Sequence, residues 1–262
     1  KDAHTVEITN DGETSFVTAD NIIIATGSEP AMIPAFHIDR EKIITSDEAL
    51  DLMDIPKEMI VVGAGALGLE FAHLFSTFGT RVTVVEMMQN IVPCMNDVDV
   101  TGAVKACLKK NGIDVKCGAG ISEINVQDDG RVCCCLASGE KVIADMALVA
   151  IGRSLNTKGL GLEDLGIEVS SRGQIVINEK MRTNIPNIYA VGDITVGPQL
   201  SHKAQKQGLV AAETICGMDS SMRYDVIPSA IFIQPEIAMV GVTAAEAQAN
   251  GIHKTVGKMQ FM

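Results

Sequence analysis

A glycine-rich turn at residues 60–70 places the tightest constraint on what this chain can fold into. The segment IVVGAGALGLE puts Gly63, Gly65 and Gly68 directly after an apolar strand and at the start of a helix. In this setting the first glycine permits the tight turn, the second lets backbone approach a pyrophosphate, and the third lets helix and strand pack closely. The N-terminus of the helix then points at the phosphates. The segment therefore predicts a βαβ unit that binds a dinucleotide.

An acidic residue at the end of the next strand indicates which dinucleotide is bound. Glu86 lies eighteen residues beyond Gly68, where a carboxylate can accept both ribose hydroxyls of the adenosine. It would repel the 2′-phosphate of NADP, and the following residues MMQN supply no cation to compensate. We therefore expect NAD. Glu70, placed on the first turn of the helix, either complements the helix dipole or lies near the nicotinamide.

The charge balance restricts the class of partner. The 262 residues are 47% hydrophobic, with a formal net charge of -12 and a sequence pI of about 4.8. A chain this acidic offers no broad basic face, so neither a nucleic acid nor an anionic membrane is an expected partner. The acidic surface either keeps the chain soluble or docks it in a multienzyme assembly. No apolar run approaches the ~18 residues that a membrane-spanning helix needs.

The two ends of the chain read as cut. The opening KDAHTVEITNDGE lacks both an initiator Met and the apolar stretch of a signal peptide. The final VGKMQFM reads as a strand that stops midway. We expect a longer parent protein, located in the cytoplasm.

The cysteines do not form a recognisable redox or zinc motif. They are Cys94, Cys107, Cys117, Cys133, Cys134, Cys135 and Cys216. No two have C-x-x-C spacing, so no metal site is expected. In a strand, Cys133 and Cys135 would face one way and Cys134 the other. Because free cysteine behaves as a small hydrophobe, we expect these three to pack in a core, in a reducing compartment.

Hydrophobic periodicity predicts the elements around the glycine turn. Alternating residues at 3–9 and 14–18, joined by Asn-Asp-Gly, predict a β-hairpin. Residues 46–54 are expected to form a short helix opened by a Ser or Asp cap. The helix after the glycine turn carries apolar residues at a 3–4 spacing, expected to bury one face and to end near Gly79. These apolar residues are Leu67, Phe71, Leu74, Phe75 and Phe78.

The remaining pattern completes an α/β fold. A helix is expected at 97–111, three strand-like pieces without intervening helices at 120–144, and a buried strand at 145–152. This is a small, doubly wound, Rossmann-like domain with an antiparallel meander. Beyond it, NIYAVGDI reads as a strand and KAQKQGLVAAETICG as a helix. Alternating strands and a helix at 244–249 follow.

Several motifs occur together and in order: ATGSEP, VVGAGALGLE, VVE, AIGR, NIYAVGDITVGPQLSHKA and IFIQPEIAMVG. In this combination the chain resembles the flavin-dependent pyridine nucleotide-disulfide oxidoreductases, most closely the dihydrolipoamide dehydrogenases. The resemblance implies FAD and NAD as cofactors and a split layout. Residues 1–38 would be the second part of an FAD domain and 39–155 an inserted NAD domain. Residues 156–225 would return to the FAD domain, and 226–262 would begin the dimer-interface domain.

The resemblance also assigns flavin-site residues. Thr26, Gly27 and Ser28 match the flavin-adjacent turn of the family, and Asp193 matches the aspartate that bonds the ribityl chain. The loop and helix start beneath the isoalloxazine correspond to Gln199, Leu200, Ser201 and His202. The family usually reads Met-Leu-Ala-His there, so Gln199 and Ser201 depart from its pattern.

The NAD site carries over in the same way. Its residues are Gly63, Ala64, Gly65, Ala66, Leu67, Gly68, Leu69, Glu70 and Glu86. The resemblance places Glu70 near the nicotinamide, and Ile121 and Gly152 beside the adenine and ribose. No catalytic residue is assigned, because the Cys-x-x-x-x-Cys pair, the His-Glu base and the flavin domain's own G-x-G-x-x-G are expected outside these 262 residues.

The implied reaction of the full-length protein is oxidation of dihydrolipoamide by NAD⁺ through FAD and a redox disulfide. The implied partners are a lipoyl domain or another small disulfide substrate and a second copy of the chain. A 2-oxo acid dehydrogenase or glycine cleavage complex would be the host assembly. NAD-dependent relatives such as mercuric reductase, NADH oxidase or transhydrogenase are alternatives. For the present chain alone, so is a catalytically inactive nucleotide-binding module.

Overall fold

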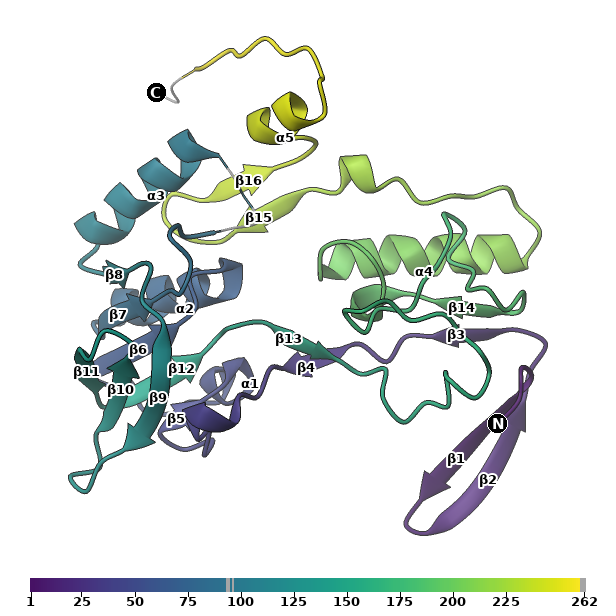
Figure 1. The fold of residues 1–262 in the computed structure, drawn as a ribbon, viewed down its shortest axis with the longest axis horizontal. Helices are drawn as coiled ribbons and strands as arrows, with labels where there is room; N and C mark the ends of the chain where they lie inside the picture. Colours follow the sequence, from purple (N-terminus) through teal and green to yellow (C-terminus); the bar gives the residue numbers. More distant parts are fainter. Residues whose placement is uncertain (93–94, 96, 260–262) are drawn as a thin grey trace. The chain divides into compact units, whose positions relative to one another are not determined.

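The computed structural model describes residues 1–92, 95 and 97–259 and has a mixed α/β architecture (Figure 1). The chain divides into two compact units. One comprises Lys1–Glu29 and Arg153–Ile227, and the other Pro30–Gly152 and Pro228–Met262. Cys94 lies outside the described residues. The division into flavin, NAD and interface domains stays a prediction.

The second unit is built on a five-stranded sheet with the order β5-β12-β6-β7-β8. All neighbouring strands are parallel. The strands are β5 (Ile43–Ile44), β6 (Glu58–Val62), β7 (Arg81–Val85), β8 (Asp114–Lys116) and β12 (Met146–Val149). Both β6 and β7 are nearly continuous runs of buried apolar residues, as a parallel sheet covered on both faces requires. The predicted Rossmann-like α/β fold is confirmed.

Helices pack on one face of this sheet, and the antiparallel meander packs on the other. Met59 and Val61 face one core together with residues of α2 (Ala66–Thr77) and α3 (Val98–Lys110). Ile60 and Val62 face a second core shared with the antiparallel meander. The meander consists of β9 (Ile121–Val126), β10 (Val132–Leu136) and β11 (Lys141–Ala144), with β10 in the middle. Its three strands lie within the predicted 120–144 segment.

The buried face of α2 differs from the predicted stripe. Leu67, Leu74 and Phe78 are 39, 42 and 57% exposed. The buried apolar side chains are Leu69, Phe71, Ala72 and Phe75. The helix is turned because Gly68 packs so closely on the carbonyl of Gly63 that an added Cβ would overlap that oxygen. This contact, rather than the 3–4 spacing of the apolar residues, sets which face meets the sheet.

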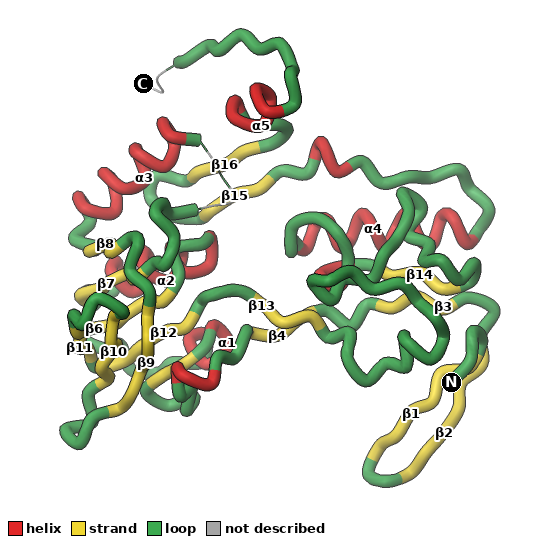
Figure 2. Tube along the Cα trace, in the orientation of Figure 1, coloured by secondary structure: helices red, strands yellow, loops and turns green. Residues whose placement is uncertain are grey.

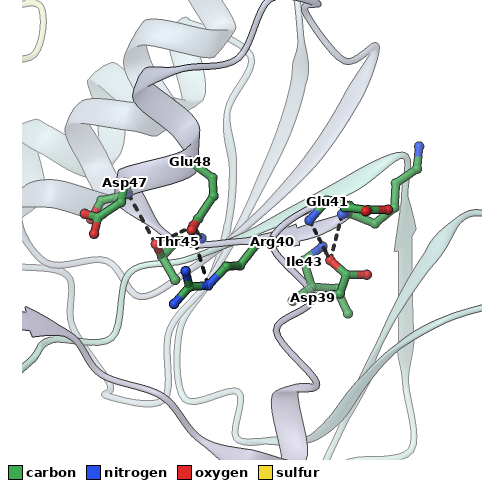
Figure 3. Close-up of polar contacts among 9 residues, drawn as sticks. Asp39, Arg40, Glu41, Ile43, Thr45, Asp47 and Glu48 are labelled. Atoms are coloured by element: carbon green, nitrogen blue, oxygen red, sulfur yellow. Dashed lines mark hydrogen bonds and ion pairs between the residues drawn. The ribbon is translucent and has the colours of Figure 1, made fainter. Parts of the chain in front are cut away.

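Helix α1 (Ser46–Leu50) is shorter than predicted and has a different cap. Figure 3 shows Thr45 in a capping box with Glu48: the Thr45 backbone N–H donates to Glu48 Oε2 at 2.9 Å, and the hydroxyl donates to the same oxygen at 2.6 Å. Beyond the helix, Leu52 already packs half-buried against the core, whereas Met53 is 93% exposed.

The first unit contains a short parallel pair, β3 (Ile22–Ile24) with β14 (Ile188–Ala190). In Figure 2, α4 (Ser201–Ile215) runs along this pair, and Val210 and Ala211 share a core with Tyr189 and Val191. The other elements of this unit are the hairpin β1 (Thr5–Asn10) and β2 (Glu13–Thr18), the paired strands β4 (Ser28–Pro30) and β13 (Arg153–Leu155), and the 3-10 turns η2 (Gly192–Ile194) and η3 (Tyr224–Val226).

The predicted hairpin turn is confirmed at Asp11 and Gly12, with φ of 50° and 82°. Further along, the second unit also contains the 3-10 turn η1 (Pro34–Phe36), β15 (Ser229–Ile231), β16 (Ile237–Met239) and α5 (Ala244–Ala249). The predicted terminal strand is wrong for residues 256–259, which are not in a strand. None of the helices in the described part of the chain is long and apolar enough to cross a bilayer.

Candidate functional site

The glycine turn after β6 has no room for a side chain at two of its glycines, Gly63 and Gly68, but has open space at the third, Gly65. Gly63 has a φ of 103°, and a side chain there would overlap the carbonyl of Ala150 on β12's exit. A side chain at Gly68 would overlap the carbonyl of Gly63, whereas one at Gly65 would meet nothing within 4 Å. The turn therefore leaves space at Gly65, where a pyrophosphate needs to approach the backbone.

The N-terminus of α2 lies beside this open space, and no side chain of its first turn compensates its partial positive charge. The N-cap is Gly65, and the described first turn contains neither a side-chain cap nor an acidic residue. Ala66, Leu67 and Leu69 complete the turn; Leu69 is buried and Leu67 is exposed. The N–H groups and partial positive charge of a helix start favour a phosphate at this position.

Glu86 is tied to the glycine turn by its own carboxylate. It is 8% exposed; Oε2 accepts the Ala64 N–H at 2.6 Å, and Oε1 accepts the Met88 N–H at 2.7 Å. The end of β7 and the turn after β6 are thus held together by one side chain. A second anion at this point would meet the charge of a nearly buried carboxylate, whereas ribose hydroxyls can donate to its remaining lone pairs.

Glu70 does not lie on the first turn of α2, which corrects the prediction. It is the fifth residue of the helix, and the first turn holds no acidic residue. The interaction with the helix dipole is therefore weak, because it falls off within the first turn. Instead, Glu70 Oε1 accepts the backbone N–H of Phe232 at 2.9 Å, just after β15.

Ile121 lies at the start of β9 in the meander, and Gly152 follows the end of β12 in the parallel sheet. Ile121 begins β9 and packs half-buried against the core beneath the meander. The Ala119 N–H donates to the Glu86 carbonyl at 2.9 Å, which brings the segment leading to Ile121 beside Glu86. Gly152 follows β12 with a φ of 127°, and its carbonyl accepts the Ala31 N–H at 3.0 Å.

The proposed flavin-side residues of the other unit form a separate polar group. Ser28 Oγ donates to Asp193 Oδ2 at 2.5 Å and accepts from Arg153 Nε at 2.7 Å. Arg153 Nη2 also donates to the Ser28 carbonyl at 2.6 Å. Thr26 Oγ1 donates to the Asn156 carbonyl at 2.6 Å, and Gly27 turns the chain with a φ of 67°. The fold thus brings residues 26–28 into contact with residues 153–156 and 193, more than a hundred positions away in the sequence.

The remaining predicted flavin-site residues lie where η2 leads into α4. Leu200 is the N-cap of α4 and is half-buried. Gln199, Ser201 and His202 are exposed.

Sequence reasoning missed two buried polar residues on α4. Lys203, 1% exposed, donates from Nζ to the carbonyls of Gly192 and Val196 at 3.0 and 3.2 Å. Gln207 is fully buried, and its Oε1 accepts the Gly192 N–H at 2.8 Å. Burial lowers the pKa of Lys203, and the charge of Asp193 opposes this shift. Their helical spacing with Val210 and Ala211 was the available signal, since it places two polar residues on the buried face.

Two of the three meander cysteines are buried as predicted, whereas Cys135 is half-buried. Cys133 and Cys134 are 2 and 0% exposed, and burial raises the pKa of Cys134 to about 12. In the described residues, no group of three or more His, Cys, Asp or Glu side chains could hold a metal ion.

Comparison with known proteins gives two family matches along the chain. Residues 1–208 match the family model of the pyridine nucleotide-disulphide oxidoreductases. Residues 227–262 match the dimerisation domain of the same oxidoreductases.

Curated relatives cover nearly the whole chain. It is 38% identical over 258 residues to leghemoglobin reductase of Glycine max, covering 97% of this chain and 49% of the relative. It is 38% identical over 256 residues to mitochondrial dihydrolipoyl dehydrogenase of Homo sapiens, covering 96% of this chain and 50% of the relative. The chain thus spans about half the length of the curated relatives it matches.

Solved structures similar to this chain also extend over about twice its length. LpdA from Mycobacterium tuberculosis matches with a TM-score of 0.87 at 32% identity, covering 93% of this chain and 53% of that one. An NAD-dependent persulfide reductase from A. fulgidus matches with a TM-score of 0.84 at 29% identity, covering 95% and 49%. The predicted cofactors, FAD and NAD, are confirmed at the level of the family. With a strand, glycine turn and acidic strand end of the expected geometry and a family model matched over residues 1–208, this chain belongs to the pyridine nucleotide-disulphide oxidoreductases.

Proposed function

We propose that this chain supplies the NAD-binding part of a flavoprotein that oxidises dihydrolipoamide with NAD⁺. The observation that carries the proposal is the Glu86 carboxylate bonded to the Ala64 N–H, because it places an acidic ribose acceptor against the open glycine turn. The two halves of a dinucleotide site are then adjacent: phosphate donors at the start of α2 and a ribose acceptor at the end of β7. The 38% identity with dihydrolipoyl dehydrogenases supports the choice of substrate.

The residues of the second unit have distinct tasks in this proposal. Gly63, Gly65 and Gly68 shape the turn, and the backbone from Ala64 to Leu69 lies along the pyrophosphate. Glu86 holds the adenosine ribose, and Ile121 and Gly152 flank the adenine and ribose. Glu70 lies near the nicotinamide, where its carboxylate would exchange the Phe232 N–H for a donor on the nucleotide.

The first unit contributes part of the flavin site. FAD, when bound, carries electrons between a disulfide and the nicotinamide, so the protein's own task is to hold and orient it. Asp193 is the ribityl contact, held by Ser28, which Arg153 in turn orients. Thr26 and Gly27 form the adjoining turn. Gln199, Leu200, Ser201 and His202 form the loop and helix start beneath the ring system.

The proposed reaction also needs a redox disulfide that these 262 residues do not supply. No two cysteines of the 262 residues have the Cys-x-x-x-x-Cys spacing of the redox disulfide. The full-length protein is therefore proposed to bring that disulfide, to form a homodimer through the segment beginning at 227, and to act on a lipoyl group in the cytoplasm. A 2-oxo acid dehydrogenase or glycine cleavage complex would host it. Mercuric reductase, NADH oxidase and transhydrogenase activities are the competing assignments.

For the chain alone, the same cysteine pattern favours a nucleotide-binding module without turnover. Titration of the chain with NADH and NADPH, followed by calorimetry, tests the NAD assignment directly. We expect NADH to bind and NADPH to bind far more weakly, because Glu86 repels a 2′-phosphate. Equal affinities would contradict the site. Reduction of lipoamide by NADH in the presence of the chain alone would contradict the module.

A further inference from the structure

The middle strand of the meander presents two thiols on one face. Cys133 and Cys135 are two positions apart on β10, and their sulfurs lie 3.8 Å from each other. Side chains two apart on a strand share a face. Cys134, between them, points the other way into the core with Ile124. The proposed function uses neither of the two thiols.

The neighbouring strands complete the surroundings of this pair. On β9, Asn125 lies opposite Cys133 and Glu123 opposite Cys135. On β11, Ile143 and Lys141 occupy the corresponding positions. Directly opposed residues in an antiparallel sheet point to the same face. Cys133 is nearly buried among them, whereas Cys135 is only half-buried, so the pair can be reached from solvent through Cys135.

Two oppositely charged side chains lie opposite Cys135: Lys141 on β11 and Glu123 on β9. Burial, together with contact with Cys135, raises the pKa of Cys133, so this group is a thiol at neutral pH. The Lys141 ammonium acts in the opposite direction on the same thiol. A monovalent ion bound by two thiolates has one net negative charge, which the Lys141 ammonium offsets and the Glu123 carboxylate opposes.

We propose that Cys133 and Cys135 form a two-thiolate site for a soft monovalent metal ion, Cu(I) or Ag(I). Soft thiolate ligands select such ions. With metal–sulfur bonds of about 2.3 Å, two sulfurs on one ion can lie up to about 4.6 Å apart. The limit of about 4.6 Å belongs to a linear S–metal–S arrangement, whereas the observed 3.8 Å corresponds to a bent one with an angle of about 110°. Both sulfurs therefore reach one ion in a bent arrangement, and side-chain rotation at the half-buried Cys135 would open the angle toward linear.

Geometry disfavours the alternative, a disulfide between the same residues. Two residues of rise along a strand separate the Cα atoms by about 6.6 Å, near the upper end of the range in which disulfides occur. The sulfurs would also need to approach to about 2.0 Å. Zinc is disfavoured as well, since its protein sites use three or four ligands and the described residues provide no group of three.

The binding step needs no oxidant. Each thiol loses its proton to solvent as its sulfur binds the ion, so one metal ion replaces two protons and the sulfurs keep their oxidation state. A metal-bound thiol is deprotonated even where its free pKa is raised. Uptake of one ion should therefore release two protons in a weakly buffered solution.

The test uses the reduced, full 262-residue chain under anaerobic conditions. Cu(I) is supplied as its coloured bicinchoninate complex, and the loss of colour measures transfer to the protein. We expect one tightly bound equivalent, with affinity reduced more than about tenfold in C133S and in C135S, since even loss of a residue behind a metal ligand costs that much. C216S is the matched control, because Cys216 is an exposed thiol in the other unit and should leave binding unchanged.

C135S decides the question if C133S fails to fold, because Cys135 is only half-buried. Equal Cu(I) affinity in C135S and the wild type would overturn the proposal, as would an equal loss in C216S. NADH titration of the same variants separates this outcome from the nucleotide site, whose binding they should retain.

Discussion

The carboxylate of Glu86 accepts the backbone N–H of Ala64 at 2.6 Å, across 22 positions of sequence. This bond joins the end of β7 to the turn after β6, so the proposed ribose acceptor and the proposed phosphate-binding turn are held together. A change at Glu86 therefore affects both the choice of nucleotide and the position of the turn.

Glu86→Arg should reverse the preference between nucleotides. The guanidinium removes the ribose acceptor and offers a charge partner to a 2′-phosphate, so NADH should bind at least about tenfold more weakly, a loss of ~1.4 kcal/mol. NADPH should lose less or gain. Titration of both nucleotides checks this, with Glu123→Arg as a control for an exposed carboxylate on the meander. Unchanged NADH affinity would show that the ribose lies elsewhere.

Gly65→Ala and Gly68→Ala should separate binding from stability. A methyl group at Gly65 meets no atom within 4 Å, so the thermal midpoint should hold while NADH binding weakens, because the methyl group occupies the open side of the turn. At Gly68 the methyl group overlaps the Gly63 carbonyl, so the fold itself should lose stability, by about 1–3 kcal/mol. Calorimetric unfolding together with NADH titration distinguishes the two. A Gly65→Ala protein with full NADH affinity would place the pyrophosphate away from this turn.

Glu58 should contribute to the free energy of unfolding, because its carboxylate pairs with two arginines. Its side chain is 19% exposed and forms ion pairs with Arg81 and Arg131, which joins the sheet to the meander. Glu58→Ala leaves Arg131, half-buried, without this partner, so we expect a loss of about 1–3 kcal/mol in urea unfolding. Asp99→Ala is the control, because its pair with Lys258 is 71% exposed on both sides and should change stability by less than ~1 kcal/mol. Equal losses would show that the Glu58 network does not connect the two layers.

Asp39 should give stability that is lost in acid. Burial raises the pKa of this carboxyl, but the N–H groups of Ile43, Glu41 and Lys42 outweigh it, and the net pKa is lowered from 3.8 (Figure 3). A carboxyl whose folded pKa is lowered stabilises the fold above its ordinary pKa, and this contribution disappears as pH falls through the folded value.

Asp39→Ala should therefore cost about 1 kcal/mol at pH 7, allowing for solvent screening at an exposed residue. The difference between the variant and the wild type should shrink as pH falls below the ordinary carboxyl range. Unfolding free energies measured across this range check the sign. A difference that grows in acid would contradict the assigned hydrogen bonds.

The chain by itself should purify without the yellow colour of bound flavin. The described flavin-side residues supply a ribityl contact and a turn, but the phosphate-binding glycine motif expected for the flavin domain does not occur in the first unit's sequence. Absorbance of the purified chain before and after addition of FAD checks this expectation. Copurified flavin would show that the half-site around Ser28 and Asp193 binds FAD on its own.

The sequence by itself determined the elements whose signals are local. The Asp11-Gly12 turn adopts positive φ, Gly79 ends α2, α5 spans Ala244–Ala249, and the meander lies within 120–144, because turn chemistry and side-chain period depend only on neighbouring residues. The glycine spacing likewise predicted the tight turn after β6, since the positive φ of Gly63 and the close approach at Gly68 leave few other residues possible.

Tertiary structure decided what depends on distant partners. The buried face of α2 was set by contact between Gly68 and Gly63 and not by the apolar stripe through Leu74. Glu70 was bonded to Phe232, 162 positions away, and Lys203 and Gln207 were buried beneath Gly192. Such contacts are not encoded in any local period, because the free energy that selects them comes from packing and from satisfying buried polar groups once the chain has folded.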